Sequence, residues 1–163
     1  MRMLISLLFA VGLFAQQFPP TDVRTLTEKR LSLPVDLPAG QSLLVIGFTQ
    51  KSQTASEAWS KQLKADLGSD FAFYSIAVLE DAPRLLRSII TGSIKRSVPK
   101  DAQDRFLIVT RGQKELKLAY GFDKAAQDDA YVALTDKTGK ISWKYHGNPT
   151  LTAIARMKAA LVR

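Results

Sequence analysis

Thr49 and Ser52 place two hydroxyl groups where a predicted buried strand, 43–48, gives way to a predicted helix. A cysteine at such a helix start acquires a lowered pKa and becomes a reactive thiolate. The chain contains no cysteine, so sulfenic acid formation, thiol peroxidation and disulfide exchange are excluded. A serine hydroxyl is far too basic to replace a thiolate. We therefore expect Ser52 to help cap the helix, with contact to a ligand as the alternative.

Other catalytic chemistry is limited by the presence of a single histidine, His146. Serine hydrolysis needs a general base beside the nucleophile, which is usually a histidine. His146 follows a predicted hairpin strand, so we expect it in surface packing at the far edge of the sheet. Metal ligation is left to carboxylates such as Asp128 and Asp129, whose sequence fits a solvated loop better than a cation site. We therefore expect no catalytic residue, no metal site and no cofactor.

Basic residues gather in the middle of the chain. Such a group is typical of a solvated face near a helix end, or of a docking surface for an acidic protein or an anionic membrane. We take it as the candidate partner-binding segment, with Lys114 as a further cation beside it. The candidate residues are Lys95, Arg96, Lys100, Arg105 and Arg111.

Apolar runs predict five strands. Four runs are continuous, which is typical of strands covered by helices on both faces, and the fifth alternates as a half-buried strand does. A glycine-containing turn over 136–140 joins the last two strands as a hairpin. The predicted strands are 43–48, 71–79, 105–110, 130–135 and 141–145.

Helices are predicted between these strands and after them. Thr54 and Glu57 match a capping box at the start of the first helix, which is expected to end at Gly68. The second helix follows Pro83, and a last helix follows Pro149. The order of elements predicts an α/β fold, a three-layer sandwich of a mixed sheet flanked by helices. The predicted buried face of the second helix consists of Leu85, Leu86, Ile89, Ile90 and Ile94.

The first forty residues predict an export signal and a leader. A basic start, an apolar run over 4–14 and Ala15 fit a secretory signal peptide over 1–15, with an uncleaved anchor or a buried helix as the alternative. Residues 16–40 hold four of the seven prolines, which predicts a largely irregular leader with one short edge strand within 31–37. The folded domain is then expected over 41–163.

Composition and charge fit an exported, monomeric protein. The 163 residues are 46% hydrophobic and 23% charged, as in one ordinary globular domain. The formal net charge of +8 falls by one when Arg2 leaves with the signal peptide. A basic exported protein suits an anionic lipid, a polyanion of the cell wall or an acidic partner, whereas export argues against nucleic acid. We expect a periplasmic or extracellular location.

The segment 116–147, LKLAYGF…DDAYVALTDKTGKISWKYHG, resembles the distal half of thioredoxin-like proteins of the peroxiredoxin and TlpA type. The resemblance extends over about 31–162 and implies a thioredoxin-like fold. The run Thr49-Gln50-Lys51-Ser52 is similar to the peroxiredoxin pattern with serine in place of cysteine. The same resemblance implies that Ala130, beside Tyr131, stands where these enzymes carry a substrate-clamping cis-proline. Thr49, Ser52, Ala130 and Tyr131 are thus degenerate redox-site positions.

A narrower resemblance is to the mitochondrial ATP-synthase assembly-factor family, whose thioredoxin-like domain is degenerate. It rests on 94–99 followed by 104–106, on 130–136 and on 139–143. Ser142 departs from the family, which prefers arginine before the tryptophan of this last motif. The resemblance implies, by analogy, a role in assembly.

These observations predict a non-catalytic exported protein that binds a protein partner, as an assembly or maturation factor for an envelope or membrane complex. The pocket around the degenerate redox-site positions would hold a peptide, and the basic segment would steer the encounter. Two other hypotheses stay open at this point. One is a structural envelope protein that binds anionic lipid or polyanion, and the other is an enzyme whose unknown reaction does not use cysteine.

Overall fold

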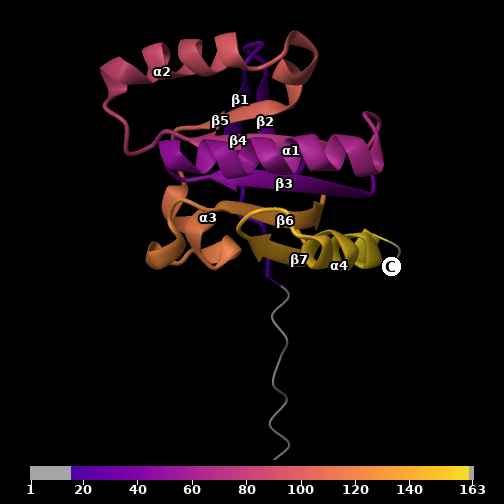
Figure 1. Cartoon of the computed structure of the whole chain (residues 1–163). Helices are drawn as coiled ribbons and strands as arrows, with labels where there is room; N and C mark the ends of the chain where they lie inside the picture. Colours follow the sequence, from indigo (N-terminus) through magenta and orange to yellow (C-terminus); the bar gives the residue numbers. More distant parts are fainter. Residues whose placement is uncertain (1–15, 162–163) are drawn as a thin grey trace, which may run out of the picture.

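The computed structural model describes residues 16–161, which form one mixed sheet of seven strands in the order β2-β1-β5-β4-β3-β6-β7 (Figure 1). The predicted signal peptide over 1–15 lies outside the described residues. The strands are β1 Thr21–Thr25, β2 Arg30–Leu33, β3 Gln41–Gly47, β4 Phe73–Val78, β5 Phe106–Val109, β6 Ala130–Asp136 and β7 Ile141–His146. The helices are α1 Gln53–Leu67, α2 Arg84–Ser97, α3 Gln113–Tyr120 and α4 Leu151–Leu161, with 3-10 turns at Gln50–Ser52, Lys100–Arg105 and Lys124–Ala126.

The centre of the sheet is parallel and its two sides are antiparallel. β3 and β4 pair in parallel, as do β4 and β5, whereas β6 and β7 complete one side antiparallel. Five consecutive residues of β3, 42–46, are buried because helices or loops cover both faces of this central strand. The five predicted strands are therefore all present, and each lies within a few residues of its predicted bounds.

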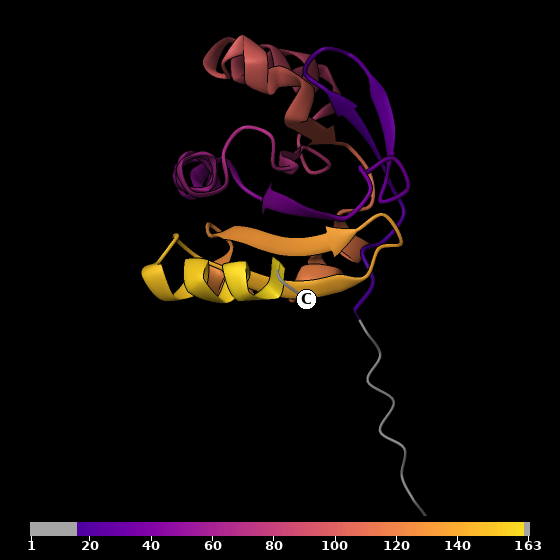
Figure 2. The ribbon, with the colours of Figure 1, turned by 90° about the vertical axis from the view of Figure 1, so that its right-hand side faces the viewer.

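Two hydrophobic cores lie on opposite faces of the sheet. α1 and α4 cover one face, where Trp59, Leu63 and Met157 are fully buried, and Figure 2 shows both helices on the same side of the strands. α3 covers the other face with Leu116 and Tyr120. The predicted three-layer α/β sandwich is confirmed.

The proline-rich segment 16–40 is not the largely irregular leader that we predicted. β1 and β2 form an antiparallel hairpin, and β1 joins the sheet by pairing with β5. The prolines do not interrupt the ladder, because Pro19 and Pro20 precede β1 and Pro34 follows β2. β2 is the outermost strand, in the region where one edge strand was expected. β1 was missed because two of its three buried residues are threonines.

The second helix does not pack as predicted. None of the residues of α2 is buried, and the side chains expected in the core include exposed leucine and isoleucine residues. Both views place α2 at one extremity of the molecule (Figures 1 and 2). Within residues 16–161, no helix is both long enough and apolar enough to span a membrane.

Candidate functional site

The degenerate redox-site positions meet at one end of the sheet. The antiparallel register of β3 and β6 pairs Gly47 with Ala130 and Ile46 with Tyr131. Thr49 and Ser52 lie in the turn that leaves β3 at the same end. The carboxyl ends of the parallel strands β3, β4 and β5 also point to this edge, which is where open α/β sheets commonly bind ligands.

Ser52 is a buried packing residue with an occupied hydroxyl. It is 1% exposed, and its Oγ donates to the carbonyl oxygen of Thr49 at 2.5 Å. Ser52 occupies the N-cap position of α1 without a side-chain capping bond, so its expected role as a cap is wrong. The cap belongs instead to the preceding 3-10 turn, where Thr49 Oγ1 accepts from the Ser52 N–H at 3.3 Å.

The predicted capping box is also wrong. α1 begins at Gln53, one residue before Thr54, so the predicted capping residue already lies inside the helix. Glu57 accepts a hydrogen bond from Gln53 Nε2 at 2.8 Å rather than reaching back to a free backbone amide. The 3-10 turn starts the helical path earlier than the sequence pattern indicates.

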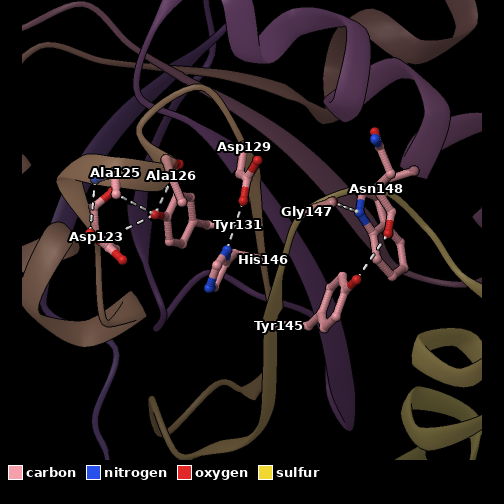
Figure 3. A network of polar contacts seen from close by, with 10 residues as sticks. Asp123, Ala125, Ala126, Asp129, Tyr131, Tyr145, His146, Gly147 and Asn148 are labelled. Carbon is pink, nitrogen blue, oxygen red and sulfur yellow. Dashed lines mark hydrogen bonds and ion pairs between the residues drawn. The ribbon is translucent and has the colours of Figure 1, made fainter.

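An aromatic cluster surrounds the end of β3. The ring centroids of Phe48 and Phe122 are 5.2 Å apart, and each is 5.6 Å from the ring of Tyr131. The Tyr131 hydroxyl accepts from the Asp123 N–H at 3.0 Å and is placed to donate to the Ala126 carbonyl at 3.1 Å (Figure 3). Burial raises the pKa of the Tyr131 phenol, so this group stays protonated as a hydrogen-bond donor.

His146 borders this cluster. It ends β7, the outermost strand on its side, as expected, but the register brings it beside Tyr131, with ring centroids 5.1 Å apart. Its Nδ1 lies 2.8 Å from Asp129 Oδ2 (Figure 3). Asp128 accepts from Thr49 Oγ1 at 2.7 Å. The two aspartates, expected in a solvated loop, are thus bonded to the site.

Among residues 16–161, no three side chains of the metal-ligating types gather closely enough to hold an ion. Asp128 and Asp129 bond to different partners, Thr49 and His146. The pair therefore closes the loop before β6 onto the end of β3 and onto β7. These bonds hold the loop before β6 in place at the site.

An open pocket of about 430 Å³ adjoins the aromatic cluster. Glu80 and Gln113 shape it, because a Glu80 carboxylate oxygen accepts from the Gln113 N–H at 2.6 Å. Lys117 Nζ lies 4.6 Å from the centroid of the Phe122 ring, within range of a cation–π contact. Sequence reasoning placed the pocket around the four degenerate redox-site positions, but none of them lines it and three of them are buried; its residues instead follow β4 and β5. The lining residues are Glu80, Asp81, Gln113, Lys114, Lys117, Leu118 and Phe122.

The candidate basic residues do not form one surface. Lys95 and Arg96 lie in the last turn of α2, and Lys100 and Arg105 lie in the 3-10 turn before β5. Arg111 follows β5 at its other end. At about 3.3 Å per residue, the six steps from Arg105 to Arg111 span up to roughly 20 Å. Only Arg111 lies at the pocket end of β5, near Lys114.

Arg105 is occupied within the fold. Its Nη1 donates to the carbonyl oxygens of Ser69 and Phe71, each at 2.9 Å. The guanidinium thus fixes the loop that leads from α1 into β4. Because that geometry needs the donors of Arg105, the residue has a structural role that its place in a basic segment does not indicate.

We predict that Arg105→Ala lowers the free energy of unfolding by about 1–2 kcal/mol, because two carbonyl groups lose a charged donor. Lys95→Ala, which removes an exposed cation of the same predicted segment, should change it by less than about 0.5 kcal/mol. Urea unfolding of the two variants measures the difference. Equal effects would contradict the structural role of Arg105.

Comparisons with known proteins identify the fold. No family model and no curated protein matches the chain. Solved structures do match: the exposed lipoprotein thioredoxin of Streptococcus pneumoniae has a TM-score of 0.60 at 14% identity, covering 88% of this chain and 100% of that one. BsSco, of the Sco family of cytochrome c oxidase assembly proteins, has a TM-score of 0.58 at 16% identity, covering 91% and 95%.

A DsbE-type thiol:disulfide interchange protein of Chlorobium tepidum has a TM-score of 0.58 at 20% identity, covering 90% of this chain and 96% of that one. Identities this low show the fold alone. None of the comparisons shows the ATP-synthase assembly-factor family, so that resemblance stays a prediction. The chain has an α/β thioredoxin-like fold, built without a cysteine.

Proposed function

We propose that this chain is a non-catalytic thioredoxin-like protein that binds a protein partner at the end of the sheet where the degenerate redox-site positions meet. The partner would be a component of a membrane or envelope complex whose assembly or maturation the chain assists, outside the cytoplasm. The observation that carries the proposal is the open pocket beside the Phe48, Phe122 and Tyr131 rings, at the end of the sheet where the buried Ser52 hydroxyl bonds to the Thr49 carbonyl.

Two features support the absence of catalysis. The redox position holds a hydroxyl that cannot become a thiolate, and that hydroxyl is already bonded to a backbone carbonyl. The single histidine is paired with Asp129 at the rim of the site, while Ser52 donates elsewhere, so the described contacts do not join a base to the serine.

The pocket supports recognition of a polypeptide. Leu118 is 70% exposed at its rim, and Phe122 and Lys117 add an aromatic surface with a cation over it. Asp81 and Lys114 bring both signs of charge to the same pocket. Apolar anchors beside charged groups are the usual composition of sites that bind peptide segments.

The solved structures support the location and the assembly role by analogy. One is an exposed lipoprotein, and another belongs to a family of cytochrome c oxidase assembly proteins. Thioredoxin-like folds host many functions, so the proposal is built on the site itself. It agrees with the export signal that the sequence predicts over 1–15.

Photo-crosslinking in the cells that make this protein tests the proposal. A photoreactive benzoylphenylalanine at Leu118 should give a discrete adduct with one protein. The same residue at Leu151, which is 92% exposed at the start of α4, should not give that adduct. The two positions are matched leucines on exposed helical surfaces, one inside the proposed site and one outside it.

Charge reversal inside the pocket provides a second comparison. Lys114→Glu should lower the yield of the Leu118 adduct by about tenfold, because a rim charge steers and holds the partner. Lys61→Glu, on the exposed side of α1, should leave the yield unchanged. The same adducts from both photoreactive positions, or none from Leu118 in a folded protein, would contradict partner binding at this pocket.

A further inference from the structure

α2 presents an apolar ridge to solvent. Leu85 is 89% exposed and Ile89 is 64% exposed, and their spacing of four residues places them on one face of the helix. Leu86, which is 47% exposed, widens the ridge toward one side. Scattered exposed leucines are ordinary, whereas neighbouring aliphatic side chains on one helix face mark an interaction surface.

The same segment carries only positive charge. Residues 84–100 contain no aspartate or glutamate. Arg96 follows Ile89 by seven residues, so it continues the ridge two turns further along the helix. An exposed apolar face flanked by cations is typical of helices that lie in the interface of an anionic bilayer. The five cations are Arg84, Arg87, Lys95, Arg96 and Lys100.

Both ends of α2 are tied to the domain. Arg87 donates to the Glu80 carbonyl at 2.7 Å and to the Ala82 carbonyl at 3.0 Å. At the other end, Gln103 Nε2 donates to the carbonyls of Lys95 and Val98, at 3.0 and 3.1 Å. The helix is therefore held at the extremity seen in Figures 1 and 2. Its ridge is open to solvent there.

We propose that α2 is an interfacial helix that docks this domain on an anionic lipid bilayer. The apolar ridge would enter the boundary between headgroups and acyl chains. The cations other than Arg87, which is bonded to the domain, would contact the anionic headgroups. A lipid surface fits this segment, because its exposed ridge is aliphatic, as acyl chains are, and the charged residues around it are all cations. The unbroken positive charge of 84–100 complements anionic headgroups directly.

This docking would place the pocket close to the membrane. Asp81 lines the pocket and lies three residues before the first residue of α2, so the two surfaces adjoin. The proposal does not depend on partner binding at the pocket. It adds a second surface, for lipid, on the helix that follows the pocket residue Asp81.

The absence of cysteine allows a direct test in the full chain. Ser93→Cys, on the exposed side of α2, would carry the only thiol and can be labelled with an environment-sensitive nitrobenzoxadiazole fluorophore. Its emission should shift to the blue with phosphatidylcholine vesicles that contain about one-third phosphatidylglycerol, and should not shift with phosphatidylcholine alone. The same label at Thr152→Cys on α4 should stay unshifted with both.

Matched serine variants distinguish binding by the ridge from non-specific binding of exposed aliphatic side chains. The double variant Leu85→Ser with Ile89→Ser should raise the lipid concentration at half-maximal shift by about tenfold or more. It removes two aliphatic side chains that the bilayer would otherwise bury. Leu151→Ser should leave it unchanged. Circular dichroism confirms that each variant is folded. No shift at position 93, an equal shift with neutral vesicles, or a shift that requires added protein instead of lipid would overturn the proposal.

Discussion

Trp59→Ala is expected to lower the free energy of unfolding by about 4 kcal/mol, the largest effect that we predict for one side chain. Trp59 lies on α1 and is fully buried against the rings of Trp143 and Tyr145, with centroids 6.4 and 5.8 Å away. Its Nε1 also donates to the Gly147 carbonyl at 2.7 Å. The substitution therefore removes a large packed volume and leaves a carbonyl without its donor.

Trp59→Phe is the matched control. It keeps an aromatic ring in the core but removes the indole N–H, so the loss should be about half as large, roughly 2 kcal/mol. Urea unfolding followed by far-ultraviolet circular dichroism measures both variants. A loss of less than about 1 kcal/mol for Trp59→Ala would contradict the packing of Trp59 against Trp143 and Tyr145.

Trp59 also connects the core to the candidate site. The N–H of Gly147 donates to the Ala130 carbonyl at 2.9 Å, at the start of β6. The indole, Gly147 and Ala130 therefore form one hydrogen-bonded path from α1 to the degenerate redox-site positions. We expect Trp59→Ala to reduce the Leu118 adduct as well, as a secondary effect of lost order at this edge.

The central sheet could be predicted from the sequence because its strands are buried on both faces. Runs such as 43–48 and 130–135 are then apolar at nearly every position, and such runs can be recognised from the sequence alone. The turn at 136–140 was equally clear from its glycine, and Gly139 does adopt a positive φ of 88°. Local chemistry determined these elements, so local patterns were enough to find them.

The peripheral elements could not be predicted in the same way. Thr21 and Thr25 are buried in β1, so the alternation of that strand does not show as apolar and polar residues. In α2 the pattern was clear and misleading. An amphipathic helix indicates that one face is apolar, but the pattern does not state whether the covering surface is the protein's own core or another molecule.

The candidate site was predicted in part. The four degenerate redox-site positions do converge, because pairing of β3 with β6 fixes their register. The basic residues were grouped by sequence distance, but β5 separates Arg105 from Arg111. The pocket residues come from separate segments that follow β4 and β5, and no spacing within one segment could reveal their proximity.

Gly47→Ala is expected to lower the free energy of unfolding by about 3 kcal/mol, because the added methyl group would overpack the core where β3 meets α1. A Cβ at Gly47 would overlap the hydroxyl oxygen of Ser52 and would lie 3.4 Å from the Ser52 Cβ. Ser52 is buried and bonded to the Thr49 carbonyl, so its hydroxyl cannot move aside without losing that bond. Urea unfolding of Gly47→Ala measures the loss.

The double variant Gly47→Ala with Ser52→Ala decides what fills the redox position. Ser52→Ala alone should cost about 1 kcal/mol for the lost hydrogen bond. If the hydroxyl occupies the space beside Gly47, the double variant should lose about 2 kcal/mol less free energy of unfolding than the two single losses added together. The reason is that the overlapping oxygen is gone. Additive losses would mean that the hydroxyl is elsewhere. Coupled losses would mean that the side chain at the redox position serves to pack β3 against α1, which is incompatible with a reactive group facing a substrate.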